Sequence, residues 1–418
     1  MERMERLKYH DILYNDDPIG PYPSHLLKRV DRPTNLVPGP IERRAARDSV
    51  FWKSLLGEYG EEMQREFKRL TVRYPMGASL VDLQWHINRL HKVSGHLSGA
   101  LGDVAAASAL NPVAPKKAPI PDDPRVMSRH LKLMGYFLGA EMIGIGRLPR
   151  SAVFTRDGKN NPVEAPFKYA IVFTVRKYDP VIRASNGWDR IFDSASFQAY
   201  QRIAMQTEVV ANYLRRLGWE AETSNMDAYI TLMPQLVLEA GLGEVSRMGI
   251  ILNPFMGANF KAAAVLTNME LEVDGYLDFG LQEYCGNCTI CAEQCPARAI
   301  PRGKQTLHNG YYTWKLNAER CNEFMILNKE GCVCGRCTKT CPWHRPNTEP
   351  HDLAGWDGSI EALHRSVDEQ RDRLIANDFV DPDELTQKWW FDLDEVDGEL
   401  IVPNEKNEEK ICREYPLQ

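Results

Sequence analysis

Nine of the ten cysteines in this chain lie between residues 285 and 341, in two runs of closely related spacing. The first run is C-x-x-C-x-x-C-x-x-x-C-P over residues 285–296, and the second is C-x-x-C-x-x-x-C-P over residues 334–342. Runs that end in Cys-Pro in this way are typical of proteins that carry two iron–sulfur clusters. The chemistry that these residues predict is one-electron transfer.

A cubane 4Fe–4S cluster needs four thiolates that converge on one small object. Three cysteines on a tight turn can reach three corners, and the last cysteine of each run ligates the other cluster. The spacing therefore predicts two sets of ligands: Cys285, Cys288, Cys291 and Cys341 for the first cluster, and Cys295, Cys321, Cys334 and Cys337 for the second. Cys332 is close enough in the sequence to exchange with Cys321 or Cys334.

Disulfides and zinc are the other interpretations of paired cysteines. Disulfides are disfavoured because the chain shows no secretory segment and cytosolic thiols stay reduced. Zinc explains one C-x-x-C pair but not two runs that both end in Cys-Pro. We expect Cys412, alone in a charged tail, to be structural or incidental.

Composition and charge exclude other classes of protein. A hydrophobic content of 43% and a charged content of 26% are ordinary for a soluble globular chain. A net charge of −6 argues against a nucleic-acid surface, and no run of 18 apolar residues predicts a membrane span. Arg43-Arg44 precedes no apolar stretch, so we expect a cytoplasmic protein that is not exported.

The elements that position the cysteines can be expected from periodicity and breakers. Residues 1–50 are rich in proline and predict an extended arm lying on the rest of the fold. Apolar residues at helical spacing predict helices within 49–70 and 79–94, and residues 95–122 predict a linker or surface loop. Further helices are expected at 125–139, 196–217, 232–241 and 359–376, and strands at 141–145, 168–176, 219–223, 248–252 and 261–267.

Helices and strands alternate from residue 123 onward, which predicts a layered α/β domain. A cluster-bearing module fused to such a domain indicates that the domain holds a redox centre of its own. That centre is not a nicotinamide, because the glycines of GAEMIGIG at 139–146 follow a helix and not a strand. The expected division is an arm and helical cap at 1–122, the α/β domain at 123–276, a two-cluster domain at 277–350 and an extension at 351–418.

Three stretches of this chain resemble the cobalamin-dependent reductive dehalogenases. They are LEAGLGE at 238–244 followed by Arg247 and Gly249, the segment from Asn253-Pro254 to Thr267, and LDFG at 277–280 followed by EYC at 283–285. The resemblance covers roughly residues 125–345 and implies the catalytic subunit of a non-exported member. It implies a fold of mixed α+β or α/β class, in which a nitroreductase-like cobalamin-binding domain precedes a bacterial-ferredoxin-like domain.

The resemblance also implies site residues. Tyr200 matches the tyrosine that donates the proton, Lys261 matches its cationic partner, and Asn225 is the candidate for an asparagine lining the same site. The implied cofactor contacts are Gly241, Gly243, Asn253 and Gly257. No Asp-x-His-x-x-Gly motif is present, so the resemblance implies base-off cobalamin without a lower ligand from the protein.

The implied chemistry suits these residue types. Replacing halogen by hydrogen takes two electrons, passed singly through the clusters from an external donor such as a ferredoxin, flavodoxin or reductase, and one proton. Tyrosine has a pKa near ~10, which a buried ammonium within hydrogen-bond reach would lower. The structural alternatives are a core tyrosine for Tyr200, a solvated strand-end lysine for Lys261 and a turn residue for Asn225.

Two other functions compete with dehalogenation. Epoxyqueuosine reductase shares the cysteine pattern, but its Arg-Asp-Tyr-His is Arg-Lys-Tyr-Asp at 176–179 here, which leaves Asp179 as the candidate acid. Its tRNA substrate also suits a net charge of −6 poorly. A plain electron carrier would leave Tyr200 and Lys261 as bystanders. We favour a small organohalide, with haloaromatics as the expected class, under a cap whose Phe51, Trp52 and Trp85 could line the pocket.

Overall fold

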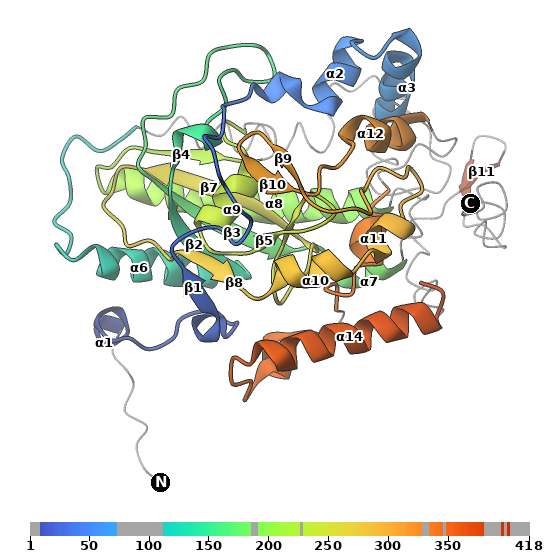
Figure 1. Cartoon of the computed structure of the whole chain (residues 1–418). Coiled ribbons are helices and arrows are strands. Elements are labelled where there is room, and N and C mark those ends of the chain that lie inside the picture. The colour runs from blue at the N-terminus through green and yellow to red at the C-terminus, as the bar shows by residue number, and fades with distance from the viewer. Residues whose placement is uncertain are drawn as a thin grey trace.

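A computed structural model of the chain describes residues 9–72, 112–184, 191–225, 229–327, 334–345, 348–379, 394–396 and 399–401 (Figure 1). Several sequence predictions fall outside these residues: the helix at 79–94, Trp85, Cys332 and Cys412. Within them the chain has a mixed α/β fold, and no helix of the described part is both long enough and apolar enough to span a bilayer.

The centre of the fold is a four-stranded sheet. Its strands are β2 (Met142–Arg147), β3 (Tyr169–Arg176), β7 (Phe260–Thr267) and β4 (Ala221–Ser224), in that spatial order. Every neighbouring pair in this sheet is antiparallel. Of the two expected classes, the sheet therefore belongs to α+β, because α/β folds are built on mainly parallel strands.

Alternation of side chains along the strands separates two cores. Ile171, Phe173 and Val265 face one core, which the helices α6 (Pro124–Phe137) and α8 (Ile191–Arg216) cover. Val172, Ala264 and Leu266 face the other core, beneath α9 (Met233–Glu239). Strands buried on both faces read as continuous apolar runs, which is why these spans were predictable from the sequence.

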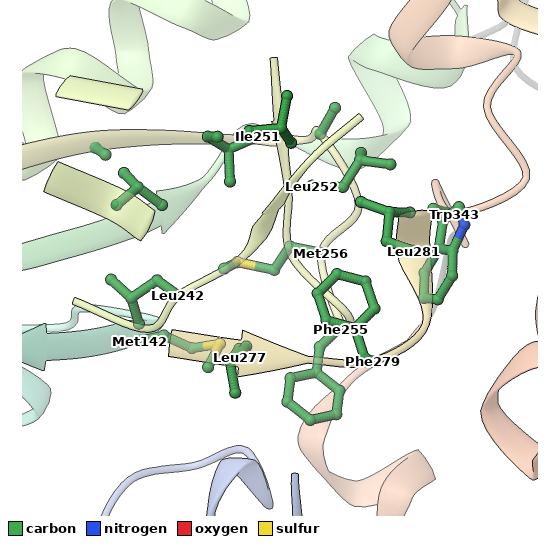
Figure 2. Close-up of a cluster of buried hydrophobic side chains, with 14 of the residues drawn as sticks. Met142, Leu242, Ile251, Leu252, Phe255, Met256, Leu277, Phe279, Leu281 and Trp343 are labelled. Atoms are coloured by element: carbon green, nitrogen blue, oxygen red, sulfur yellow. The ribbon is translucent and has the colours of Figure 1, made fainter. Parts of the chain in front are cut away.

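The second core joins the sheet to the cysteine block. Figure 2 shows Met142 of β2 and Leu242 at one end of a buried cluster whose other end holds Leu281 and Trp343 of the cysteine-bearing part, with Met256 and Phe255 between them. The thiols of Cys285, Cys291 and Cys341 belong to the same buried cluster. The expected boundary between residues 276 and 277 falls inside β8 (Tyr276–Asp278), so the two parts share one apolar interior.

Short elements surround the cysteines. They are the helices α10 (Leu281–Asn287), α11 (Ile290–Glu293), α12 (Ala318–Leu327) and α13 (Arg336–Lys339), with a hairpin of β9 (Thr306–His308) and β10 (Tyr311–Thr313). A second small pair, β5 (Glu244–Val245) and β6 (Ile251–Leu252), lies before them in the chain. Only Ile251–Leu252 of the strand expected at 248–252 is extended, because residues 246–250 form a turn closed by Ser246 and Ile250.

The N-terminal segment lies across other parts of the chain. Helix α1 (Tyr9–Tyr14) contacts α6, and β1 (Lys28–Val30) pairs antiparallel with β8. Arg43 donates hydrogen bonds to the carbonyls of Val153 and Phe154, over distances of 2.9 and 2.7 Å. The extended backbone of this N-terminal segment therefore forms hydrogen bonds with segments that are distant in the sequence.

The helix expected within 49–70 is two helices, α2 (Val50–Leu56) and α3 (Glu61–Val72). Gly57 ends α2 with a φ of 80°, a left-handed conformation that favours glycine, and so interrupts the helical pattern. Figure 1 shows both helices beside α12, where Asn322 donates a 2.7 Å hydrogen bond to the Ser54 hydroxyl. The described part of the expected cap therefore packs on the helix that carries Cys321.

The other expected helices and strands are confirmed, with small shifts of their ends. Helix α8 begins five residues before its expected start at 196, and α14 (Ile360–Ala376) matches its expected range. Residues 112–123 form a loop beside the end of α8. The Ala114 amide donates a hydrogen bond to the carbonyl of Arg215 in α8, and the Ala118 amide donates one to the carbonyl of Leu217, just after the helix.

The glycines of GAEMIGIG have a packing role. A Cβ on Gly144 of β2 would lie 2.0 Å from the carbonyl oxygen of Ala240, and one on Gly146 would lie 2.5 Å from the carbonyl carbon of Glu239. The end of α9 therefore rests directly on the backbone of β2, and the absence of side chains is what permits this approach.

Replacing Gly144 by alanine should lower the free energy of unfolding by about 1–3 kcal/mol, since backbone must move to admit the methyl group. Urea unfolding midpoints measure this loss. The matched control is Gly303→Ala, where an added Cβ meets no atom within 4 Å. Equal midpoints for the two variants would contradict the close approach of α9 and β2.

Candidate active site

The candidate acid and its partner meet at one end of the sheet. Lys261 lies at the start of β7, opposite Val175 of β3, and its side chain falls on the face that α8 covers. The ammonium nitrogen of Lys261 lies 4.5 Å from the centroid of the Tyr200 ring, which α8 contributes. The structure thus brings together the two side chains that the resemblance implied, in a cation–π contact.

Asn225 follows the last residue of β4. Ser224 pairs with Ala264, so alternation assigns the next position, Asn225, to the same face of the sheet as Lys261. The side chain of Asn225 is buried, with 4% of the residue exposed, and among the described residues its amide nitrogen has no hydrogen-bond acceptor. Since an unpaired buried donor costs about 1–3 kcal/mol, this amide is available to a bound group.

Lys177 shares this end of the sheet, and sequence analysis did not single it out. It is 3% exposed, it directly follows β3, and its ammonium lies 4.0 Å from the centroid of the Phe192 ring. Burial holds the pKa of Lys177 well below the usual value for lysine, and the charge of Lys261 lowers that pKa further. No sequence signal marks it, because one lysine at a strand end is ordinarily solvated.

Asp179 is engaged by three side chains and is a poor candidate for an acid. Arg176 donates to its carboxylate over 3.2 Å, His344 lies 3.4 Å away, and the Asn259 amide also donates to it. Burial alone would raise the pKa of Asp179, but His344 and Arg176 outweigh burial and lower that pKa. An ionised carboxylate has no proton to give at neutral pH, which disfavours the epoxyqueuosine reductase alternative.

The eight described cysteines are free thiols that fall into two neighbourhoods. Burial raises the pKa of Cys341 well above its usual value, and the nearby Cys291, Cys285 and Cys288 raise it further. Burial raises the pKa of Cys321 to about 12, with Cys337 and Cys295 adding to the effect. The neighbours of Cys341 and Cys321 agree with the two predicted ligand sets. Cys337 also lies near Cys291, so the two sets adjoin, and the ligand assignments stay predictions.

We call Cys285, Cys288, Cys291 and Cys341 the first thiol group, and Cys295, Cys321, Cys334 and Cys337 the second thiol group. Among the described residues no three His, Cys, Asp or Glu side chains surround a single metal position. A cubane instead presents four separate iron corners, and thiolate is the ligand that iron–sulfur clusters take. Free, largely buried thiols gathered in two groups fit that chemistry.

The segment between α9 and β6 holds α10 at both ends. Glu244 accepts hydrogen bonds from the amides of Phe279 and Leu281, at the start of α10, over 3.1 and 3.3 Å. Arg247 donates to the carbonyls of Cys285, Gly286 and Cys288, at the end of α10, over 2.9, 3.1 and 2.8 Å. Negative charge at the amide end and positive charge at the carbonyl end complement the helix dipole.

The four residues implied as cofactor contacts lie in protein contacts. A Cβ on Gly241 would lie 2.0 Å from the Gly275 carbonyl oxygen, one on Gly243 2.3 Å from the Leu252 oxygen, and one on Gly257 2.5 Å from the Trp343 oxygen. The Asn253 carboxamide donates to the Leu242 carbonyl and accepts from the amides of Phe255 and Met256. These contacts account for each residue type by packing alone.

Comparison with known proteins gives this site a context. No family model matches the chain. Tetrachloroethene reductive dehalogenase of Desulfitobacterium hafniense is 31% identical over 229 residues, which is 52% of this chain and 40% of that protein. The catabolic reductive dehalogenase NpRdhA has a solved structure that matches with a TM-score of 0.76 and 31% identity, over 92% of this chain and 53% of that chain.

This chain is a relative of the reductive dehalogenases. It spans about half the length of the relatives that it matches. Epoxyqueuosine reductase of Synechocystis sp. is 31% identical over only 123 residues, which is 28% of this chain and 41% of that protein. The reductive dehalogenase match covers nearly twice as much of the chain, so the tRNA-modifying alternative is the less favoured one.

Replacing Asp179 by asparagine should lower the free energy of unfolding by about 3 kcal/mol, because the buried Arg176 then lacks its carboxylate partner. Urea unfolding at pH 7 measures the change. Asp372→Asn is the control, since that carboxylate forms an ion pair at 71% side-chain exposure and should cost less than about 1 kcal/mol. A loss at Asp179 as small as that at Asp372 would show that the buried pair contributes little.

Proposed function

We propose that this chain catalyses reductive dehalogenation, replacing a halogen of a small organohalide by hydrogen with the help of cobalamin and two 4Fe–4S clusters. The observation that carries the proposal is the Lys261 ammonium over the Tyr200 ring, at a sheet end that also approaches the second thiol group through Lys177. A proton donor and an electron-carrying part thus adjoin one site. The likeness to NpRdhA supports the same conclusion.

The proposal assigns a task to each part of the chain. Residues 123–276 form a nitroreductase-like part that would hold the corrinoid, and residues 277–350 form a ferredoxin-like part. The described residues 9–72 and 112–122 belong to the proposed cap over the substrate pocket, and the described residues from 351 onward extend the fold. The eight cysteines of the two thiol groups hold the clusters. Asn225, with its buried unpaired amide, supports a bound group at the sheet end.

The protein's own residues manage the proton and the position of the substrate. When bound, the corrinoid and the clusters supply the two electrons. Tyr200 gives its hydroxyl proton to the carbon that loses the halogen, and the positive charge of Lys261 stabilises the phenolate left behind. The Asn225 amide donates a hydrogen bond that orients the group bound beside them. Tyr200 regains its proton from solvent before the next turnover.

Haloaromatics are the substrate class that this site suits best. A solved structure of NpRdhA is described as a complex with 3-bromo-4-hydroxybenzoic acid. In this chain the ammonium of Lys261 gives the sheet end a positive charge that an ionised phenol would complement. We further propose a cytoplasmic location and an external donor of single electrons, such as a ferredoxin, a flavodoxin or a reductase.

Reconstitution with iron, sulfide and cobalamin tests the proposal. The loaded protein should absorb with both an iron–sulfur shoulder and a corrinoid band, and should release halide from halophenols faster than from haloalkenes when given a strong reductant. Iron–sulfur absorption without any bound corrinoid would instead identify an electron carrier. A loaded protein that releases halide from neither class would refute the dehalogenase.

Replacing Tyr200 by phenylalanine should lower the rate of dehalogenation by about 10²–10⁴-fold, the usual contribution of general acid catalysis. Phenylalanine keeps the ring beneath Lys261 but removes the proton, so iron and cobalamin contents should stay at the wild-type level. Turnover of a halophenol, measured beside cofactor content, separates the two effects.

The control for this variant is Tyr213→Phe. Tyr213 lies on the same helix about 20 Å further along, and its hydroxyl lies 2.8 Å from the His130 ring. Its loss should leave turnover unchanged. Wild-type turnover in the Tyr200 variant would show that another group donates the proton.

A further inference from the structure

Each thiol group has a buried cation beside it, and both cations come from the part of the chain that precedes the cysteine block. Arg247 is 2% exposed and lies at the first thiol group, where it donates to carbonyls of α10. Lys177 is 3% exposed and lies toward the second thiol group. The proton chemistry proposed for Tyr200 does not explain why either cation is buried in its place.

A packed aromatic ring links Lys177 to the second thiol group. The Lys177 ammonium lies 4.0 Å from the centroid of the Phe192 ring. A Cβ on Gly335, the residue between Cys334 and Arg336, would lie 2.2 Å from Cδ2 of the same ring. Gly335 also has a φ of 63°, so both its conformation and its contact with the ring require glycine. The Phe192 ring therefore contacts both the Lys177 ammonium and the loop that carries Cys334 and Cys337.

Lys177 is held in this place from its backbone. Its amide donates to the Asn259 carbonyl over 3.0 Å, and the Asn259 side-chain amide donates back to the Lys177 carbonyl over 3.3 Å. Within the described residues its ammonium forms no hydrogen bond and no ion pair, and Phe192 is its cation–π partner. Burying an ammonium without a carboxylate is costly, so an ion-pairing role does not explain it.

Arg247 is placed in a similar way at the other group. Its guanidinium donates to the carbonyls of Pro301 and Gly303 as well as to those of α10, and its Cζ lies 4.9 Å from the centroid of the Trp314 ring. Among the described residues no carboxylate pairs with it, so its positive charge is not cancelled locally.

We propose that Lys177 and Arg247 are positioning residues that set the reduction potentials of two clusters independently, Lys177 for the cluster of the second thiol group and Arg247 for that of the first. The inference rests on the proposed function. A reduced cluster carries one more negative charge than an oxidised one, so a nearby ammonium or guanidinium group favours the electron taken from the external donor. Charge and hydrogen bonds near the sulfurs are established influences on cluster potential.

Redox titration of the reconstituted protein, followed by electron paramagnetic resonance, tests this. Lys177→Met removes the charge and keeps the length of the side chain. It should make one cluster harder to reduce by about tenfold, which corresponds to about 59 mV for one electron, and leave the other unchanged. Arg247→Gln should shift the other cluster in the same direction, and Arg247→Lys, which keeps the charge, should restore most of that shift.

The matched control is Lys168→Met. Lys168 directly precedes β3 and Lys177 directly follows it, so the two variants change net charge equally at sites about 30 Å apart. The Lys168 variant should shift neither cluster. Its side chain is 60% exposed and is paired with Glu270.

Several outcomes would overturn the inference: neither variant shifts a potential, both shift the same cluster, or Lys168→Met shifts a cluster as much as Lys177→Met. Should Lys177→Met lose iron, Lys177→Gln serves in its place, and loss of iron from both would assign Lys177 a purely structural role. These results differ from a failure of the proposed function. There the wild-type protein would bind no corrinoid or release no halide, whatever the potentials of its clusters.

Discussion

The buried guanidinium of Arg247 is the interaction on which the cysteine-bearing part depends. It collects carbonyls from two separate segments, residues 285–288 and residues 301–303, and lies against Trp314. The last carbonyls of a helix have no partners within that helix, and burying them unpaired is unfavourable. The Arg247 side chain supplies hydrogen-bond donors for the carbonyls at the end of α10 and for those in the loop that follows α11. The turn that carries the first three cysteines is thereby fixed before any cluster is considered.

Glu244 completes this arrangement from three residues away. The Glu244 carboxylate accepts hydrogen bonds from the amides of Phe279 and Leu281 at the start of α10. Burial raises the pKa of Glu244, and these hydrogen bonds oppose that rise. The Thr34 hydroxyl of the N-terminal arm also donates to this carboxylate, so the arm is part of the same support. A glutamate and an arginine placed three residues apart thus hold both ends of one short helix, which gives a physical reason for both residues in the AGLGE-x-x-R stretch.

The shared apolar core joins the cysteine-bearing part to the sheet that carries the candidate site. Cys285, Cys291 and Cys341 are buried with residues from one face of the sheet, while Tyr200 and Lys261 lie on the opposite face at its end. Separating the cysteine block from the sheet would expose this core at a cost of about 25 cal/mol for each Å² of apolar surface. The two parts therefore keep a fixed relation. The chain's net charge of −6 also conceals several buried cations, including Arg176, Lys177 and Arg345.

The sequence by itself determined the spacing of the cysteines, from which the clusters are predicted, and most of the elements. Cysteine spacing is a local property, and apolar runs in β3 and β7 or helical periodicity in α8 are readable within one window of sequence. The resemblance to a family supplied Tyr200, Lys261 and Asn225. Gly57 shows where local reading failed, because a left-handed residue divided a helical pattern that was otherwise continuous.

Only the tertiary structure decided which distant residues act together. Lys177 meets the loop of Cys337 through Phe192, and Arg247 meets carbonyls well beyond it in the chain, although nothing near either residue in sequence signals such a contact. The physical reason is that the significance of a charge depends on its burial and its neighbours. Burial follows from how strands and helices pack across the whole chain, whereas residue type and spacing record only what lies nearby along it.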